Sequence, residues 1–354
     1  MNGVRPVVWS IAGNDSAGGA GLAADQRAAA AFGVHLCPVV AAVTAQNSRT
    51  VTQIAPVAPE LLEAQLSALA DDLPPAAVKT GLLGSAAHVV AVARWIDRLR
   101  QRAPVALVVD PVLRASTGAA FADDTALAAY RDLLLPRATL VTPNVAEARA
   151  LVGRVAGDAP ALARALKALC AQAVAVTGGD ETNAPGGSRD WIDTPHASGW
   201  LALPRIDTPH SHGTGCTFAT SAAAALALGF VPADALVLAK MATAHALQSG
   251  YAAGQGAGPV AARAGFGALP DVLPLMSWDS SGHFDAGAWA LTLAFDRQAE
   301  AFSPRPLGGE GQAEGVRYTG DFCRATAAAL SPNPSPASGR GEQNPFAPQS
   351  DIGL

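Results

Sequence analysis

The sequence predicts an α/β protein with a mostly parallel sheet and helices on both of its faces. Short β-rich runs alternate with alanine- and leucine-rich helical stretches over the first 250 or so residues, and this alternation is typical of consecutive βαβ units. The run VALVVDPV at 105–112 is almost wholly apolar, as a strand covered by helices on both faces should be.

The elements follow one another in a regular order. Apolar, β-branched runs between turn signals predict the strands, and apolar positions at helical spacing predict the helices. Strands are expected at 7–13, 34–46, 76–83, 105–112, 138–144 and 173–179. Helices are expected at 20–32, 59–71, 88–100, 124–134, 146–152, 159–170, 215–229 and 233–250. The polar, Pro- and Gly-rich stretch 180–199 predicts a loop or a β-excursion.

Composition limits the classes of function. Of 354 residues, 50% are hydrophobic and 15% are charged, a balance that suits a well-packed core. A net charge of −5 gives no reason to expect nucleic acid or an anionic membrane as a partner. The four cysteines show no CxxC spacing, which argues against a cysteine-bound metal. The first residues do not resemble a signal peptide and no apolar run is long enough to span a membrane, so a cytoplasmic protein is expected.

Domain organisation follows from a change in composition near residue 303. Residues 1–275 are expected to form one domain, and 276–302 a C-terminal segment of it whose structure the sequence does not define. Residues 303–354 are rich in Pro, Gly and Ser. Such a segment buries too little apolar surface to offset its chain entropy, so a disordered tail is predicted.

A glycine-rich loop, AGNDSAGGAGLAADQ at 12–26, joins the first strand to the first helix. Open α/β sheets bind ligands at such junctions, although this loop matches neither a Walker motif nor GxGxxG. Asp25, one turn into the helix, either orients a polar heterocycle or is a solvated helix charge. Gln46 ends the second strand, where its amide either reads a donor–acceptor edge or caps a loop.

Two further strands end in candidate site residues. Asp110 follows the most apolar strand, where a carboxylate can hold a cation or accept a proton, or simply initiate a turn. Asn144 and Glu147 lie three residues apart at a predicted helix start. The pair can hold a hydrated Mg²⁺ or form a capping box.

The motif GTGC, residues 213–216, opens a long alanine-rich helix. Backbone N–H groups and the helix dipole converge at this position and would stabilise charge on a transferring phosphoryl group. A helix N-terminus also lowers the pKa of a thiol, so Cys216 is a candidate for a thiolate near neutral pH. The alternative is a small cysteine that merely packs.

In this order the motifs resemble one family closely. The matching stretches are IAGNDSAGGAGLAADQRAAAAFGVH, AAVTAQNS, VKTGLLGS, VVDPVLRASTGAAF, LLPRATLVTPNVAEARAL, SHGTGCTFATSAAAALALG and AKMATAHALQSGYAAGQGAGPV. The chain is similar, over about residues 7–260, to the hydroxymethylpyrimidine and phosphomethylpyrimidine kinases of thiamine biosynthesis. The resemblance implies a ribokinase-like three-layer sandwich.

The resemblance also implies roles for individual residues. The pyrimidine pocket would include Gly13, Asp25, Gln46, Leu82 and Val112. Around ATP and Mg²⁺ it implies Asp110, Asn144, Glu147, Thr177 and Lys240, with Asp110 and Glu147 nearest the metal. The anion hole would be the turn Gly213, Thr214, Gly215 and Cys216, with Cys216 as the base that deprotonates the substrate hydroxymethyl.

One departure from the family pattern concerns the second of two phosphorylations. Many members read VKGGH where this chain has VTGGD at 176–180. Thr177 thus replaces a lysine near the nucleotide phosphates, and a lost cation weakens electrostatic stabilisation of a more anionic substrate. Lys240 or Arg114 are candidates for compensating it.

The resulting prediction is ATP- and Mg²⁺-dependent phosphorylation of 4-amino-5-hydroxymethyl-2-methylpyrimidine, and then of its monophosphate. A pyridoxal-type vitamin B6 kinase and a pyrimidine-binding protein that has lost phosphoryl transfer are the alternatives. The expected partners are small molecules, with no nucleic acid and no membrane, and a homodimer is one assembly the prediction allows.

Overall fold

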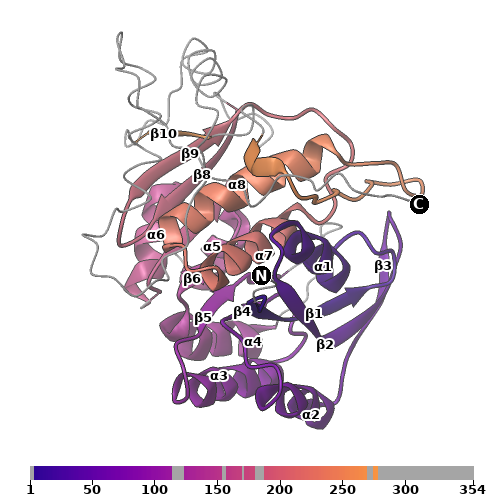
Figure 1. Ribbon diagram of the computed structural model, residues 1–354, viewed down its shortest axis with the longest axis vertical. Helices are drawn as coiled ribbons and strands as arrows, with labels where there is room; N and C mark the ends of the chain where they lie inside the picture. The colour runs from indigo at the N-terminus through magenta and orange to yellow at the C-terminus, as the bar shows by residue number, and fades with distance from the viewer. Residues whose placement is uncertain are drawn as a thin grey trace.

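A computed structural model describes residues 4–113, 123–153, 157–169, 171–179, 187–268 and 274–277. Within these residues the chain forms one sheet in the order β10-β9-β8-β7-β6-β5-β4-β1-β2-β3 (Figure 1). The strands are β1 (Val7–Asp15), β2 (His35–Gln46), β3 (Val51–Pro56), β4 (Ala77–Thr80), β5 (Ala106–Val109), β6 (Leu140–Val141), β7 (Val174–Thr177), β8 (Ser188–Asp193), β9 (Ser198–Leu203) and β10 (Leu275–Ser277).

The centre of the sheet is parallel and its two ends are antiparallel. Strands β2, β1, β4, β5, β6 and β7 pair in parallel. Strand β3 and the strands β8, β9 and β10 pair antiparallel at the two ends. The carboxyl ends of the parallel strands therefore meet at one edge of the sheet, which is where α/β folds place their ligand sites.

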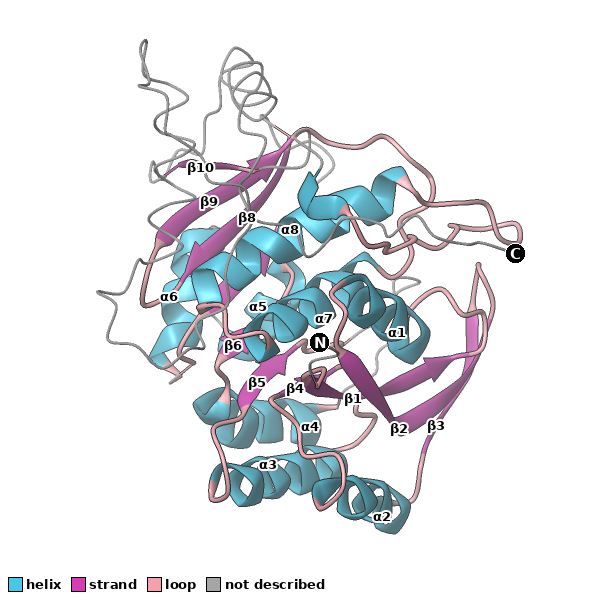
Figure 2. Cartoon of the chain, in the orientation of Figure 1, coloured by secondary structure: helices cyan, strands magenta, loops and turns pink. Residues whose placement is uncertain are grey.

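Helices cover both faces of the sheet (Figure 2). One face carries α1 (Gly21–Ala31), α7 (Thr214–Ala227) and α8 (Pro232–Gln248), packed on one buried apolar cluster. The other carries α2 (Pro59–Ala70), α3 (Ala86–Arg100), α4 (Asp124–Ala129), α5 (Val145–Val152) and α6 (Ala159–Ala168), packed on or beside a second cluster. The predicted three-layer α/β architecture is confirmed.

Alternation along β1 explains how one strand serves both clusters. Val8 points into the cluster under α1, α7 and α8, while Trp9 and Ile11 point into the opposite one. Helix α7 contributes mainly alanines to its interface, from Ala219 to Ala225. Small side chains let this helix lie close to the central strands, which brings its N-terminus to the ligand edge of the sheet.

The structure adds detail that the sequence reading lacked. The edge strand β3 was not predicted, and the stretch 180–199 contains β8 and the start of β9, as the β-excursion alternative required. The helix expected at 124–134 is α4 followed by a π-helical turn, Tyr130–Leu134. Arg114, Asp180 and the predicted tail 303–354 lie outside the described residues, as does the segment 276–302 apart from the end of β10. Among the described residues, no helix has the length and apolarity needed to cross a bilayer.

Candidate active site

The predicted site residues gather at the carboxyl edge of the sheet. Gly13 in β1 and Leu82 just after β4 touch, since a Cβ on Gly13 would lie 3.0 Å from Leu82 Cδ2. Asn144, three residues after β6, and Thr177, the last residue of β7, pair as an isolated bridge. Val112 follows Asp110 in the turn after β5 and is half-buried. Segments far apart in sequence are thus brought to one edge.

A buried charge cluster lies beneath this edge. Lys79, on β4, is fully buried, and its Nζ lies 3.1 Å from both carboxylate oxygens of Asp25. The same Nζ lies 3.6 Å from Asp110 Oδ2. Burial alone would lower the pKa of Lys79, but Asp25, Cys216 and Asp110 together outweigh burial and raise it. Lys79 is therefore a fixed cation between two acidic residues.

Asp25 is neither a solvated helix charge nor an exposed wall of a pocket. Its carboxylate is fully buried and also accepts hydrogen bonds from Ser10 Oγ at 2.6 Å and Thr220 Oγ1 at 2.7 Å. With Lys79, these donors engage both of its oxygens. In this structure Asp25 therefore anchors Lys79 and ties α1 to α7, one layer below the surface where a ligand would lie.

Asp110 is the more available of the two carboxylates. It is 6% exposed, and its Oδ2 has the ion pair with Lys79 but no hydrogen bond. Burial raises its pKa to about 6, against the opposing effect of Lys79. The hydroxyl of Thr142, after the adjacent strand β6, is also buried without a partner. Unpaired buried oxygens at one edge suit a cation or a polar ligand.

The glycine-rich loop folds onto an acidic residue of its own. Asp15 Oδ1 accepts the N–H of Ala17 at 2.8 Å, and Oδ2 accepts those of Gly19 at 3.0 Å and Ala20 at 2.9 Å. These N–H groups are therefore not offered to a ligand anion. The loop is a preformed wall of the site, and an anion receptor has to lie elsewhere.

The loop is joined to the turn before α7 by His212. Its Nε2 lies 3.1 Å from Asp15 Oδ2 and 3.3 Å from the side-chain amide of Gln46. A Cβ on Gly19 would collide with the His212 ring. Gln46, the predicted reader of the pyrimidine edge, is thus held against the GTGC turn.

The GTGC turn has the geometry that its sequence predicts. Gly213 caps α7 with φ of 89°, a left-handed conformation that favours glycine, and a Cβ there would collide with the carbonyl oxygen of Gly19. Thr214, Gly215 and Cys216 form the first turn of α7. The N–H of Thr214 donates to the carbonyl oxygen of Ser211 at 3.3 Å. The N–H groups of Gly215 and Cys216 lie in the first turn of the helix, where the helix dipole favours an anion.

The expectation of a thiolate at Cys216 near neutral pH is not supported. Burial raises the pKa of the half-buried thiol to about 12, which outweighs the opposing effects of Lys79 and of the Gly21 N–H. The carboxylates of Asp25 and Asp110 raise the pKa further. Desolvation at this position is stronger than the helix dipole.

Asn144 and Glu147 form a complete capping box at the start of α5. Asn144 Oδ1 accepts from Glu147 N at 2.8 Å, and Glu147 Oε2 accepts from Asn144 N at 3.0 Å. The structural alternative is therefore realised, and it positions both side chains at the site edge. No group of three or more His, Cys, Asp or Glu side chains with metal-binding geometry occurs in the part of the chain described.

Lys240, expected to neutralise phosphate, is already paired. Its Nζ lies 2.8 Å from Asp190 Oδ2 and 3.0 Å from Ser188 Oγ, and it is 6% exposed. Asp190 Oδ1 accepts the N–H of Gly178 at 3.1 Å. Lys240 is thus paired with Asp190, which in turn holds the backbone beside Thr177. Its charge is therefore not available to replace the lysine that many family members have at position 177.

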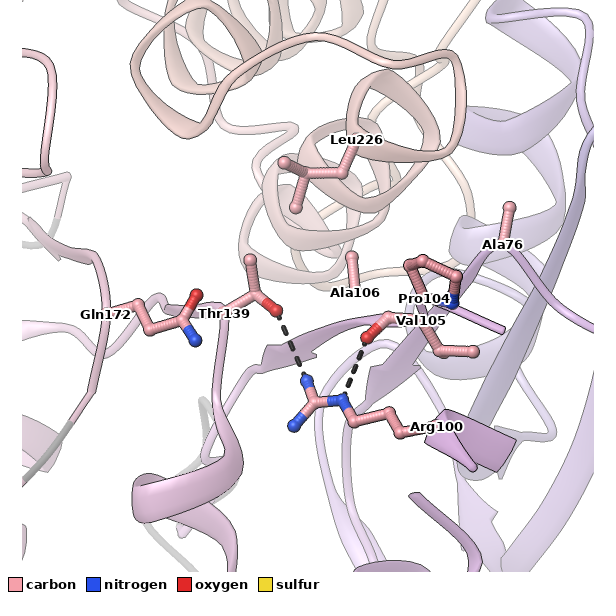
Figure 3. A pocket seen from close by; sticks show the side chains of 8 residues that line it. All are labelled: Ala76, Arg100, Pro104, Val105, Ala106, Thr139, Gln172 and Leu226. Atoms are coloured by element: carbon pink, nitrogen blue, oxygen red, sulfur yellow. Dashed lines mark hydrogen bonds between the residues drawn. The ribbon is translucent and has the colours of Figure 1, made fainter. Parts of the chain in front are cut away.

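A separate hollow opens at the opposite, amino edge of the sheet (Figure 3). It encloses about 560 Å³ beside Arg100, whose Nε donates to Val105 O at 3.0 Å and whose Nη2 donates to Thr139 Oγ1 at 3.4 Å. Those bonds join α3 to the starts of β5 and β6. The hollow lies far along the strands from Asp110 and Cys216 and takes no part in their site.

Three residues of the site were missed by sequence reasoning: Lys79, Asp15 and His212. Lys79 had a signal, because a lysine stands in an otherwise apolar predicted strand, AAVKTGLL. Asp15 and His212 stand inside motifs that were singled out for their neighbours. Their importance comes from a contact between residues 197 positions apart, which local sequence does not reveal.

The fold and the site define an α/β phosphotransferase with a ribokinase-like architecture. The family model described as phosphomethylpyrimidine kinase matches residues 15–261. The chain belongs to this family.

Individual relatives and a solved structure are similar to this chain over most of its length. The hydroxymethylpyrimidine/phosphomethylpyrimidine kinase of Synechococcus elongatus is 42% identical over 258 residues, which cover 72% of this chain and 96% of that protein. The thiamine biosynthesis bifunctional protein ThiED of Geobacter sulfurreducens is 39% identical over 259 residues, which cover 72% of this chain and 52% of that protein. The solved structure of pyridoxal kinase from Staphylococcus aureus in complex with pyridoxal superposes with a TM-score of 0.66 at 29% identity, covering 73% of this chain and 93% of that one.

Proposed function

We propose that the chain phosphorylates the hydroxymethyl group of 4-amino-5-hydroxymethyl-2-methylpyrimidine with ATP, and then phosphorylates the resulting monophosphate. The observation that carries the proposal is the contact between the glycine-rich loop and the GTGC turn, made by His212 and by Gly213 against Gly19. Through this contact Gln46, the proposed pyrimidine reader, lies against the turn that carries Cys216. A hydroxymethylpyrimidine and a phosphoryl group fit side by side in such a site.

The pyrimidine would lie against the wall formed by Gly13, Leu82 and Val112, with Gln46 on its polar edge. A glycine at position 13 keeps this wall open, because any larger residue there would put its Cβ against Leu82. Asp25 acts from below by holding Lys79. We therefore place Asp25 in the support of this pocket and not among the groups that touch the ring.

The phosphoryl group would be received by the N–H groups at the start of α7, where the helix dipole favours negative charge. Cys216 would accept the hydroxyl proton of the substrate as that oxygen attacks the phosphoryl group in line. The neighbouring cation, Lys79, opposes the effect of burial and so favours the thiolate.

Magnesium fits the acidic side of the site. Asp110, after β5, presents a buried oxygen without a hydrogen bond. Glu147 lies at the start of the helix that follows the neighbouring strand, β6. Mg²⁺ in kinases uses one or two protein carboxylates, waters and phosphate oxygens, and when bound it neutralises the phosphate charge. Asp110 and Glu147 would hold the ion, and Asn144 and Thr177 would border the nucleotide phosphates.

The second phosphorylation is expected to be the weaker of the two. Thr177 supplies no charge, and Lys240 is bound to Asp190. A monophosphate substrate adds negative charge to a site that has lost a cation, so its turnover should fall more than that of the alcohol. The role of Arg114 as a compensating cation stays a prediction, as do the cytoplasmic location and the homodimer.

Pyridoxal is the second candidate substrate, because a pyridoxal kinase with bound pyridoxal shares this fold at 29% identity. It also carries a ring hydroxymethyl group. The third possibility is a pyrimidine-binding protein without phosphoryl transfer.

The deciding experiment measures ADP release by purified protein with ATP and Mg²⁺ and, separately, the pyrimidine alcohol, its monophosphate and pyridoxal. The proposal requires the pyrimidine alcohol to have the highest kcat/KM. A clear preference for pyridoxal would replace it with the vitamin B6 kinase. If the unmodified protein and Cys216→Ser bound the pyrimidine equally and were equally inert, the chain would be a binding protein.

A further inference from the structure

Three segments meet at the His212 ring: the end of β1 with its loop, the end of β2, and the turn before α7. The Nε2 atom of His212 lies 3.1 Å from Asp15 Oδ2 and 3.3 Å from the side-chain amide of Gln46. The His212 side chain is 14% exposed and that of Asp15 is 4% exposed. We call these three residues the Asp15–His212–Gln46 clamp.

The proton on His212 can be assigned from its partners. Burial by itself would raise the pKa of Asp15, but hydrogen bonds from His212, Ala20 and Ala17 outweigh it and lower the pKa. Asp15 is therefore an ionised carboxylate, which only accepts hydrogen bonds. The Nε2 atom of His212 must carry a proton in order to donate to it.

A protonated Nε2 fixes the orientation of the Gln46 amide. In the structure Gln46 Nε2 faces His212 Nε2 at 3.3 Å, and Gln46 Oε1 accepts from Thr44 Oγ1 at 3.3 Å. Because a protonated Nε2 cannot accept from an NH₂ group, we infer that the amide is reversed, with its carbonyl oxygen toward His212 and its NH₂ toward Thr44 Oγ1. Thr44 is able to accept, since it donates its own proton to Asn14 O at 3.1 Å. The single proton on Nε2 is then shared between Asp15 Oδ2 and the Gln46 carbonyl oxygen, and the Gln46 NH₂ donates to Thr44 Oγ1.

Packing prevents the ring from moving away. A side chain on Gly19 would collide with the His212 ring, and one on Gly213 would collide with the Gly19 carbonyl oxygen. Arg27 also holds the loop through the carbonyl oxygens of Gly18 and Gly19. The ring thus lies directly against the backbone of Gly19, and that backbone is itself held by Gly213 and Arg27.

We propose that His212 determines substrate specificity by locking the Gln46 amide in the single orientation that pairs with a 4-aminopyrimidine edge. This inference rests on the proposed function. The locked amide keeps one N–H donor and one carbonyl lone pair free. A 4-aminopyrimidine offers the complementary pair, an amino donor beside a ring nitrogen acceptor. Pyridoxal has no amino group beside a ring nitrogen, so it leaves one partner of the amide unmatched.

A rigid polar group discriminates better than a mobile one. A site built to hydrogen-bond a polar edge rejects an analogue without it, because the site's own polar groups stay unpaired. Without His212 the amide could rotate and adapt to pyridoxal. His212 is a positioning residue in this scheme, because it acts through Gln46 and need not touch the substrate.

The test compares His212→Ala with the conservative His212→Gln, whose terminal NH₂ can donate to Asp15 in place of the ring. For each variant, kcat and KM are measured for the pyrimidine alcohol and for pyridoxal. In His212→Ala, the ratio of kcat/KM for the pyrimidine over pyridoxal should fall by about 10- to 100-fold, mainly through KM for the pyrimidine. His212→Gln should restore at least part of the ratio.

The matched control is His210→Ala, which removes a histidine two positions away in the same loop. His210 packs against Gly250 and Gly258 and not against Gln46. Its ratio should match that of the unmodified protein. The proposal is overturned if His210→Ala lowers the ratio as much as His212→Ala does, or if His212→Ala lowers turnover of both substrates equally.

A measurement without substrate separates this inference from the proposed function. Hydrogen exchange of the Gly19 and Ala20 amides, which donate to Asp15, should be faster in His212→Ala than in the unmodified protein and His210→Ala. Unchanged exchange would show that His212 does not hold the loop. If the unmodified protein turned over neither compound while exchange behaved as expected, the clamp would stand as a structural device and the proposed function and its specificity role would fall.

Discussion

Among single residues, Lys79 is the central support of the site, because it is a fully buried cation that pairs with two carboxylates. Removing one member of a buried ion pair leaves the other charge without compensation. Lys79→Met should therefore destabilise the protein by about 3–5 kcal/mol, measured as the free energy of unfolding in urea. The neutral double variant Lys79→Met/Asp25→Asn should recover most of that loss. If the single variant unfolded at the same urea concentration as the unmodified protein, the pair would not be the support described here.

The raised pKa of Cys216 makes a specific prediction about pH. If the thiolate is the base and its pKa is about 12, the reactive fraction grows with pH throughout the neutral range. The value of kcat/KM for the pyrimidine alcohol should then rise about tenfold per pH unit from pH 6 to 9, because this constant reports the free enzyme. Cys216→Asp, with a base that is already ionised, should show a nearly flat profile. A plateau above pH 7 in the unmodified protein would exclude the thiol as the titrating base.

At the scale of elements, strands buried on both faces were the most predictable. Their apolar runs identify β1, β4, β5, β6 and β7 directly. Strand β3 was missed because it lies at an open edge and none of its residues is buried. A strand of that kind has no apolar pattern, and its pairing with β2 depends on the rest of the sheet.

The site was predictable only in part, for a related reason. Motifs identified Gln46, Asp110, Asn144 and Cys216 by their place after a strand or before a helix. The partners that set their behaviour come from other elements, and sequence position does not reveal them. The thiol of Cys216 is the clearest case, because its helix position predicted a low pKa and burial imposes a high one.

The start of α7 supplies a test at this scale. Gly213→Ala combines a left-handed φ with a collision against Gly19, so it should cost at least about 1–3 kcal/mol and lower the Tm by about 2–4 °C for each kcal/mol. Gly215→Ala is the matched control for stability, since a Cβ there meets nothing within 4 Å and its φ is not positive. Its Tm should stay the same or rise slightly, as alanine is the better helix former. Equal losses in both variants would contradict the role given to Gly213.

For the whole molecule, the family match ends at residue 261 and the Pro/Gly/Ser-rich segment begins at 303. A chain that stops at residue 302 is therefore expected to keep its fold and its turnover. The Tm should change by no more than about 2 °C and kcat/KM by no more than about twofold, because the removed segment has few apolar residues to bury. A larger loss of either would show that the segment packs on the domain.

The long reach of the contacts around Asp25 and Asp15 has a consequence for how the protein is made. Thr220 bonds Asp25 across 195 positions, and His212 bonds Asp15 across 197. During synthesis β1 and α1 leave the ribosome first, yet their buried carboxylates stay without these partners until α7 has emerged. A nascent chain that stalls before residue 220 thus carries an unfinished, charged interior. These contacts form only after residue 220 has been made, so the junction of the glycine-rich loop, α1 and α7 is completed late in synthesis.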